Sequence, residues 1–257
     1  MIQRDEVDGI AVVRLAHGKV NALDRELAEA ITAAFRELAD SPHPAVVLTG
    51  SGRAFSAGVD LRRMVREGPE YGQPFLSRLE QAFETVFNLP KPVVAAVNGH
   101  AIAGGCVLAS ACDRRLMTDI GAYIGVPELY AGVPFPSAAL EIMRFTVGDA
   151  RLADLVLTGA TLRPQDALRA GLIDEVVAPG NLVAQAVRHA ANLAASIPSA
   201  TFRLTKHQLR YPVNQRLQEA RRRDEPDVIA SWAAAETTEW ISAYMDRITQ
   251  ERVQGGP

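Results

Sequence analysis

The first two thirds of the chain alternate short apolar runs with segments of helical periodicity. We predict strands at 10–15, 45–49 and 93–97, where apolar and β-branched residues follow one another almost without interruption. Apolar residues recur at helical spacing through 24–40, which opens on an aspartate suited to an N-cap, and through 77–87. This alternation is typical of an α/β fold.

The last quarter of the chain has no strand pattern, and its apolar spacing predicts helices. Three helical segments are separated by prolines, which lack the backbone N–H that a helix interior needs. They are 182–197, 201–209 and 227–250, with breaks at Pro198, Pro212 and Pro226. We therefore divide the chain into a core, 1–198, and a helical C-terminal region, 199–257.

Composition narrows the class of protein. A chain of 257 residues allows one large domain or one domain with an appendage. A net charge of −3 provides no broad positive field, which argues against a nucleic-acid partner. The two cysteines, Cys106 and Cys112, are too few for a disulfide framework and have no Cys/His cluster beside them, so we expect no metal site.

Neither the start of the chain nor its apolar stretches resemble a targeting or membrane segment. The first eight residues are acidic and lack an apolar core. The longest apolar stretch, 101–109, is far shorter than the ~20 residues that a spanning helix needs. We expect a cytoplasmic protein with no membrane partner.

Two glycine-containing turns, 54–61 and 98–106, follow predicted strands at points where helices should begin. Small residues let a ligand approach the backbone, and unpaired N–H groups at a helix start stabilise negative charge. The pair of turns therefore predicts an oxyanion hole, although the same small residues also suit close packing of helix on sheet. The second turn lacks the Lys-Ser/Thr pair of a nucleotide phosphate loop.

A set of motifs spread along the chain resembles one known family. The motifs are Lys19-Val20-Asn21-Ala22-Leu23, the block from Phe55 to Leu61, the block from Pro90 to Gly99, the stretch from Ala103 to Asp113, Gly125-Val126-Pro127-Glu128, and the block from Ala167 to Val177. Together they resemble the crotonase superfamily, or enoyl-CoA hydratase/isomerase family, and are closest in pattern to Δ3-Δ2-enoyl-CoA isomerases. The resemblance implies an α/β spiral of repeated β-β-α units with a C-terminal helical trimerisation region. It also implies a homotrimer or a hexamer, an acyl-CoA substrate and no cofactor, because coenzyme A is part of the substrate.

The resemblance also assigns roles to residues. In the family, backbone N–H groups at the positions of Ala57 and Gly104 bind the thioester oxygen, and the glutamate at Glu128 transfers protons, so these three are the predicted catalytic residues. Trp240 and Tyr244 are expected near a neighbouring subunit's CoA site. The predicted substrate-binding residues are Lys19, Val20, Ala22, Ser56, Ala57, Gly58, Val59, Asp60, Leu61, Gly104, Val107 and Pro127.

One departure from the family pattern bears on the reaction. Hydratases of the family carry a glutamate at the position of Val107 as well as at Glu128, because addition of water needs two proton-transferring groups. A valine cannot exchange a proton, whereas double-bond migration needs only one base. We therefore predict an isomerase that removes a proton from C2 of a 3-enoyl thioester and returns it at C4. Apolar neighbours are expected to raise the pKa of Glu128.

Other interpretations stay open. Hydration with Glu141 or a bound water as the acid, a lyase reaction such as decarboxylation, thioester hydrolysis, and non-catalytic acyl-CoA binding all fit the motifs. Glu128 could also be a helix-cap or surface residue. We expect Asp60 to cap a helix and His100 to be a polar spectator beside the second turn.

Side chains outside these motifs suggest how a CoA thioester would be held. Arg62, Arg63, Arg66 and Lys19 are candidates for binding the CoA phosphates, although arginine is also common on ordinary protein surfaces. Apolar residues are expected to line the acyl pocket. They are Met64, Phe75, Leu79, Phe83, Phe135 and Leu140.

Overall fold

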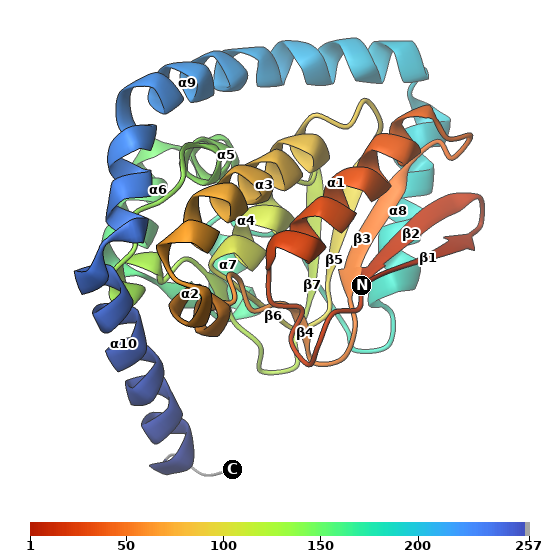
Figure 1. Ribbon diagram of the computed structural model, residues 1–257. Helices are drawn as coiled ribbons and strands as arrows, with labels where there is room; N and C mark the ends of the chain where they lie inside the picture. The colour runs from red at the N-terminus through yellow and green to blue at the C-terminus, as the bar shows by residue number, and fades with distance from the viewer. Residues whose placement is uncertain (255–257) are drawn as a thin grey trace.

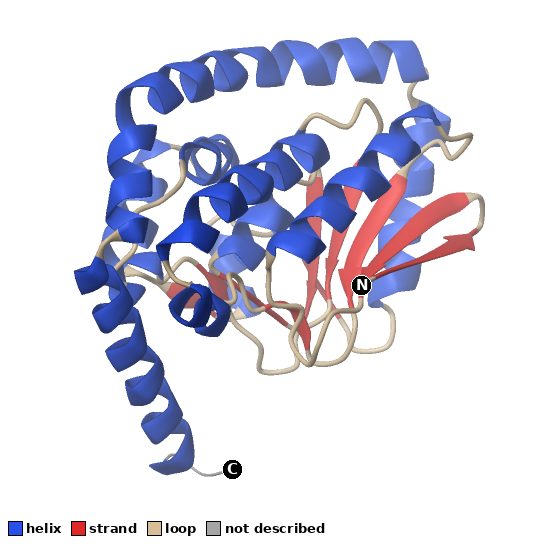
Figure 2. Ribbon diagram, viewed as in Figure 1, coloured by secondary structure: helices blue, strands red, loops and turns tan. Residues whose placement is uncertain are grey.

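The structure is a computed structural model that describes residues 1–254, with side chains through residue 250. Its larger sheet has the strand order β1-β2-β3-β5-β7-β10 (Figures 1 and 2). The strands are β1 (Ile2–Val7), β2 (Ile10–Leu15), β3 (Val46–Gly50), β5 (Val93–Val97), β7 (Arg114–Thr118) and β10 (Glu175–Val177). β1 and β2 pair antiparallel, and the remaining neighbours are parallel. The three predicted strands are thus β2, β3 and β5.

A smaller sheet has the order β4-β6-β8-β9. Its strands are β4 (Ala54–Ser56), β6 (His100–Ile102), β8 (Ile124–Gly125) and β9 (Thr161–Leu162). β3 leads into β4, β5 into β6 and β7 into β8, and helical structure follows each pair. This order confirms the predicted spiral of β-β-α units. It places the two predicted turns at the ends of β4 and β6, which are parallel neighbours.

Helices cover both faces of the larger sheet (Figure 1). The helical elements of the described residues are α1 (Arg25–Asp40), α2 (Leu61–Glu67), α3 (Pro69–Phe87), α4 (Gly104–Ser110), the 3₁₀ helix η1 (Glu128–Ala131), α5 (Ser137–Val147), α6 (Asp149–Thr158), α7 (Pro164–Arg169), α8 (Leu182–Ser196), α9 (Ser199–Ala233) and α10 (Ala235–Gln254). Successive residues of β3 face opposite sides of the sheet, and both sides are covered, which explains the continuous apolar run of this strand. Leu48 packs in the cluster with α1 and α3, whereas Val47 packs in the cluster with α8. Asp24 caps α1 by accepting from the N–H of Leu27 at 2.8 Å, as predicted.

The C-terminal region contradicts two of the predicted helix breaks. α9 runs without interruption from Ser199 to Ala233 and contains both Pro212 and Pro226. A proline inside a helix removes one hydrogen bond and favours a bend, and Figure 1 shows α9 turning sharply before it reaches α10. Buried Arg210 before Pro212, Val213 between the two prolines and Trp232 after Pro226 anchor the helix, so it continues through them. Residues 255–257 of the predicted C-terminal region lie outside the described residues.

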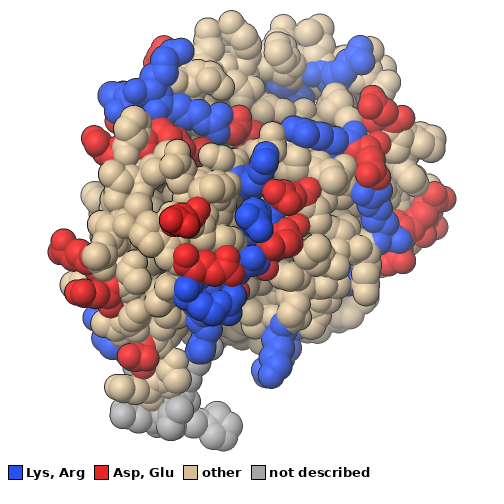
Figure 3. Space-filling model, viewed as in Figure 1, with Lys and Arg blue, Asp and Glu red and all other residues tan. Residues whose placement is uncertain are grey.

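The described surface has a mixed charge pattern. On the face drawn in Figure 3, basic and acidic side chains are interspersed and do not form a single basic patch. Among the described residues, no helix is long and apolar enough to cross a membrane.

Candidate active site

The two glycine-containing turns contact one another through their backbones. Gly58 has φ +82°, and a Cβ built on it would lie 2.6 Å from the carbonyl oxygen of Ile102 and 2.8 Å from the Cβ of Ala103. The same position is 3.3 Å from the backbone nitrogen of Gly104, the first residue of α4. Only glycine fits at position 58, and its absent side chain is what lets the backbone of the first turn reach the start of α4.

The N–H groups of the first turn differ in what they bind, and this corrects one predicted role. The N–H of Ala57 donates to the carbonyl oxygen of Val20 at 3.0 Å, so it is already used within the protein. Leu23 binds the residues on either side of Val59. Its N–H donates to the carbonyl oxygen of Gly58 at 2.7 Å, and its carbonyl oxygen accepts from the N–H of Asp60 at 3.0 Å. Within the described residues, the N–H of Val59 has no acceptor.

The corrected donor pair is therefore Val59 with Gly104. The N–H of Gly104 also has no acceptor within the described part of the chain, since it opens α4 and lies before the first intrahelical bond. Two unpaired N–H groups on touching turns can both point at one oxygen, which is the arrangement that stabilises an oxyanion. The N–H of Gly104 is thus available for its predicted role, whereas Ala57 connects the turn to the loop of Val20.

A buried asparagine holds the first turn in shape. Asn21 has φ +51° and no exposed surface, and its Nδ2 donates to the carbonyl oxygens of Ala54 at 3.0 Å and Phe55 at 3.2 Å. Ser56 donates from Oγ to the Asn21 carbonyl at 2.7 Å and accepts from the Gly58 N–H at 3.2 Å. The hydroxyl of Ser56, a predicted substrate-binding residue, thus supports the turn from inside. Sequence reasoning missed Asn21, although it stands in a quoted motif.

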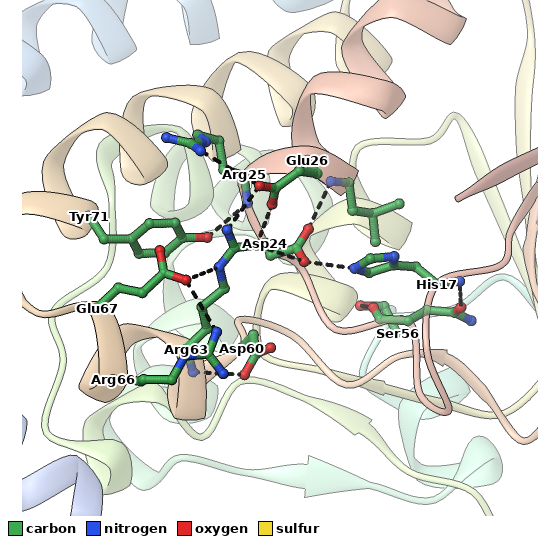
Figure 4. A network of polar contacts seen from close by, with 12 residues as sticks. His17, Asp24, Arg25, Glu26, Ser56, Asp60, Arg63, Arg66, Glu67 and Tyr71 are labelled. Atoms are coloured by element: carbon green, nitrogen blue, oxygen red, sulfur yellow. Dashed lines mark hydrogen bonds and ion pairs between the residues drawn. The ribbon is translucent and has the colours of Figure 1, made fainter.

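Arg63 is held within a network of carboxylates (Figure 4). Its guanidinium donates to Glu26 at 2.9 Å and Glu67 at 2.8 Å, and it lies 4.8 Å from the ring centroid of Tyr71. This guanidinium lowers the pKa of Glu26 to about 2. Because Arg63 is already paired with carboxylates, the exposed Arg62 and Arg66 are better candidates for binding CoA phosphates, and the role of Arg63 there stays a prediction. Asp60 accepts from the Arg63 N–H at 3.0 Å and caps α2, as predicted.

Other predicted binding residues sit around the same turn. Lys19, Val20, Arg62 and Arg66 are exposed, so the three cations among them stay candidates for CoA phosphates. Further predicted substrate-binding residues are partly buried and lie beside Asn21, in the first turn or directly before η1. They are Ala22, Ala57, Val59, Asp60, Leu61 and Pro127.

Glu128 is a buried carboxyl at the first position of η1. It is 8% exposed, and within the described residues its Oε2 has no hydrogen-bond partner. Burial raises the pKa of Glu128 to about 8, opposed only by its own backbone N–H. The thiol of Cys106 in α4 has its pKa raised by burial first and by the nearby Glu128 charge second, so Glu128 faces α4. A helix-cap or surface role for Glu128 does not fit this burial.

Val107, which follows Cys106 in α4, is fully buried and cannot supply a second carboxyl. Glu141, the alternative acid, pairs with Arg144 at 3.0 Å and Arg216 at 2.8 Å. Both carboxylate oxygens of Glu141 are therefore engaged in ion pairs, one with α5 and one with α9. His100 is exposed and accepts from the N–H of Tyr123 at 3.2 Å, as suits a spectator.

The predicted acyl-pocket residues belong to one apolar cluster beside the two glycine-containing turns. A Cβ built on Gly104 would lie 2.9 Å from Leu23 Cδ1 and 3.4 Å from Phe83 Cζ. Phe83 thus reaches the start of α4, and Leu23, which was not predicted, lies closer still. The other predicted members of this cluster are Met64, Phe75, Leu79, Phe135 and the partly buried Leu140.

Trp240 packs on its own chain. Its Nε1 donates to the carbonyl oxygen of Tyr130 at 3.0 Å, and its ring covers Gly132 just after η1. α10 packs against η1 and α2 of the same chain. Trp240 remains 51% exposed, so the expectation that it lies near a neighbouring subunit's site stays a prediction. Figure 1 shows α10 beside α2.

The spiral of β-β-α units defines this chain as a crotonase-fold protein. A family model described as Enoyl-CoA hydratase/isomerase matches residues 5–251, and the chain belongs to the enoyl-CoA hydratase/isomerase family. A Rhizobium meliloti protein named probable enoyl-CoA hydratase is 36% identical over 183 residues, 70% of each chain. Mouse mitochondrial enoyl-CoA delta isomerase 1 is 27% identical over 255 residues, covering 98% of this chain and 88% of that protein.

A solved structure confirms the fold independently. The crystal structure of human mitochondrial delta3-delta2-enoyl-CoA isomerase matches with a TM-score of 0.91 at 24% identity, covering 98% of this chain and 99% of that one. Relatives with both hydratase and isomerase names thus share this architecture, and the reaction has to be argued from the site.

Proposed function

We propose that this protein shifts the double bond of a 3-enoyl-CoA to the 2-position, with Glu128 as the single proton shuttle. The observation that carries the proposal is the buried carboxyl of Glu128, with an Oε2 that has no partner among the described residues and with Val107 in place of a second glutamate. One carboxyl can remove a proton and deliver it again, whereas hydration needs a second group to activate water.

The proposed reaction has two proton transfers. The thioester carbonyl accepts hydrogen bonds from the N–H groups of Val59 and Gly104, which stabilise the negative charge that develops on its oxygen. The carboxylate of Glu128 takes the proton from C2 and leaves a dienolate. The same carboxyl then returns this proton to C4, so the double bond moves into conjugation and the enzyme regains its starting state.

The proposal needs neither a metal nor a prosthetic group, because the thioester itself acidifies the C2–H bond. We also propose a homotrimer, or a hexamer of two trimers, acting in the cytoplasm on a free acyl-CoA. Arg62, Arg66 and Lys19 are the proposed cations for its phosphates. Apolar residues next to Gly104, led by Phe83 and Leu23, would receive the acyl chain.

Hydration is the second candidate, favoured by the name of the Rhizobium meliloti relative. Two separate reactions distinguish the candidates: a short 3-enoyl-CoA and a 2-enoyl-CoA, each followed by mass and by the absorbance of the conjugated thioester. Conjugation of the first without hydration of the second supports the isomerase. Incorporation of solvent oxygen into a 3-hydroxyacyl product would overturn it in favour of hydration.

Glu128→Gln tests the assignment of the shuttle. The variant should lose turnover while its affinity for the acyl-CoA stays nearly unchanged, because the amide keeps the size of the side chain but cannot take a proton. Turnover that survives this substitution would refute Glu128 as the base. If the wild-type protein binds the thioester but converts neither compound, the non-catalytic binder replaces both enzymatic candidates.

A further inference from the structure

Both tryptophans of the chain lie in the C-terminal helices, and both donate to the segment that carries Glu128. Trp232, near the end of α9, donates from Nε1 to the carbonyl oxygen of Pro134 at 3.0 Å. Trp240, in α10, donates from Nε1 to the carbonyl oxygen of Tyr130 at 3.0 Å. Two indole groups that are eight positions apart in the sequence thus bind one short stretch at two points.

The stretch they bind has little secondary structure of its own. η1 is a single 3₁₀ turn from Glu128 to Ala131, and carbonyl groups at the end of such a turn lack intrahelical donors. Trp240 supplies a donor to one of these carbonyls, and its ring covers the left-handed Gly132, where a built Cβ would lie 2.5 Å from Cδ1. The end of η1 is therefore capped by a side chain of α10.

The carboxyl of Glu128 has weak local restraints. Its Oε2 has no hydrogen-bond partner among the described residues, so no polar contact fixes that oxygen in place. The position of the carboxyl then follows from the backbone of η1 and from the surrounding packing. A proton shuttle that serves two carbon atoms depends on that position, because proton transfer requires hydrogen-bond reach of both.

We propose that Trp240, assisted by Trp232, is a positioning residue: the C-terminal helices hold η1 and the loop that follows it by these two indole donors and so keep Glu128 in its buried, reactive place. This inference rests on the proposed function, because it assigns the two side chains a role in that reaction. It gives α9 and α10 a task within their own subunit.

Trp240→Phe tests the inference, because the variant keeps an aromatic ring at this position and removes the indole N–H. Trp240 is 51% exposed, so the protein should fold. Tyr211→Phe is the matched control. It removes a hydrogen bond to Gln215, 3.2 Å long, from another exposed aromatic side chain of the C-terminal helices. Trp232→Phe provides the second position, where the removed donor serves Pro134.

Two measurements are made on each variant: kcat and KM with the 3-enoyl-CoA, and the pKa of Glu128 by ¹³C NMR of the labelled carboxyl. We expect Trp240→Phe to lower kcat about two- to tenfold, the worth of one hydrogen bond, with KM within twofold of wild type. The pKa of Glu128 should move back toward the ordinary range of a glutamate, because a loosened η1 admits water. Tyr211→Phe should change neither quantity.

The inference is overturned if Trp240→Phe keeps both the wild-type kcat and the wild-type pKa of Glu128, or if Tyr211→Phe lowers kcat equally. An equal loss in both variants would mean general destabilisation of the C-terminal helices. A wild-type protein that converts neither thioester would refute the proposed function instead. The titration of Glu128 in Trp240→Phe would then decide the positioning role on its own.

Discussion

The raised pKa of Glu128 makes a prediction about stability that does not depend on any substrate. A carboxyl that titrates near 4.5 when unfolded and at about 8 when folded retains its proton in the native state over the intervening pH range. The unfolded chain binds fewer protons there, so the free energy of unfolding falls as pH rises from 4.5 to 8. At about 1.4 kcal/mol per pKa unit, ionised Glu128 costs the native state about 5 kcal/mol above pH 8.

Glu128→Gln removes this titration and keeps the size of the side chain. Urea unfolding at pH 5 and at pH 8.5 should show the variant gaining about 4 kcal/mol over wild type between the two conditions, because Gln stays neutral at both. Comparison with wild type cancels other titrating groups, including Glu80, whose pKa burial raises to about 7. Glu70→Gln, at an exposed position of α3, should follow wild type.

The result that refutes this reasoning is a constant difference in unfolding free energy. If wild type and Glu128→Gln keep the same difference within about 1 kcal/mol at both pH values, Glu128 titrates in the native state much as it does in the unfolded chain. The carboxyl would then be hydrated, and the argument from burial to catalysis would fail with it.

Two further predictions concern the reaction and the turn that supports it. The kcat/KM for a 3-enoyl-CoA should rise about tenfold per pH unit and level off near pH 8, because the base form of Glu128 accumulates there; a pH-independent rate between 6 and 8 would contradict this. Asn21→Asp should lower the free energy of unfolding by about 1–3 kcal/mol in urea, since a carboxylate oxygen would replace the donor to the carbonyls of Ala54 and Phe55. Asn192→Asp, at an exposed site of α8, is the control and should stay within about 0.5 kcal/mol of wild type.

Hydrophobic patterning predicted the main strands of the larger sheet, because strands covered on both faces are apolar at nearly every position. It missed the smaller sheet, whose strands β8 and β9 have only two residues each and leave no period to detect. It also placed helix ends at Pro212 and Pro226, where tertiary packing of Val213 and Trp232 carries α9 onward. Hydrophobic patterning and the helix-breaking tendency of proline describe local sequence only, and long-range packing outweighs the effect of these two prolines.

In the candidate site too, local sequence predicted some features and long-range contacts decided others. The motifs located both turns and Glu128, yet the spacing of Ala57, Gly58 and Val59 does not reveal which N–H group is free. That choice depends on a carbonyl 37 positions earlier in the chain, at Val20, which takes up the N–H of Ala57. Likewise, the ion pair of Arg63 with Glu26 joins α2 to the first turn of α1, and no pattern within either helix predicts it.

These placements give the two halves of the site a common design. The proposed oxyanion donors are backbone groups, and Asn21 and Ser56 support the turn of one of them, Val59, from inside. The carboxyl of Glu128 stands on a short turn that Trp240 holds from α10. In both halves, a reacting group depends on a hydrogen bond from outside its own element. A change at a single position such as Val107 would therefore alter the number of acids at the proposed site while leaving the spiral, the turns and their supports the same.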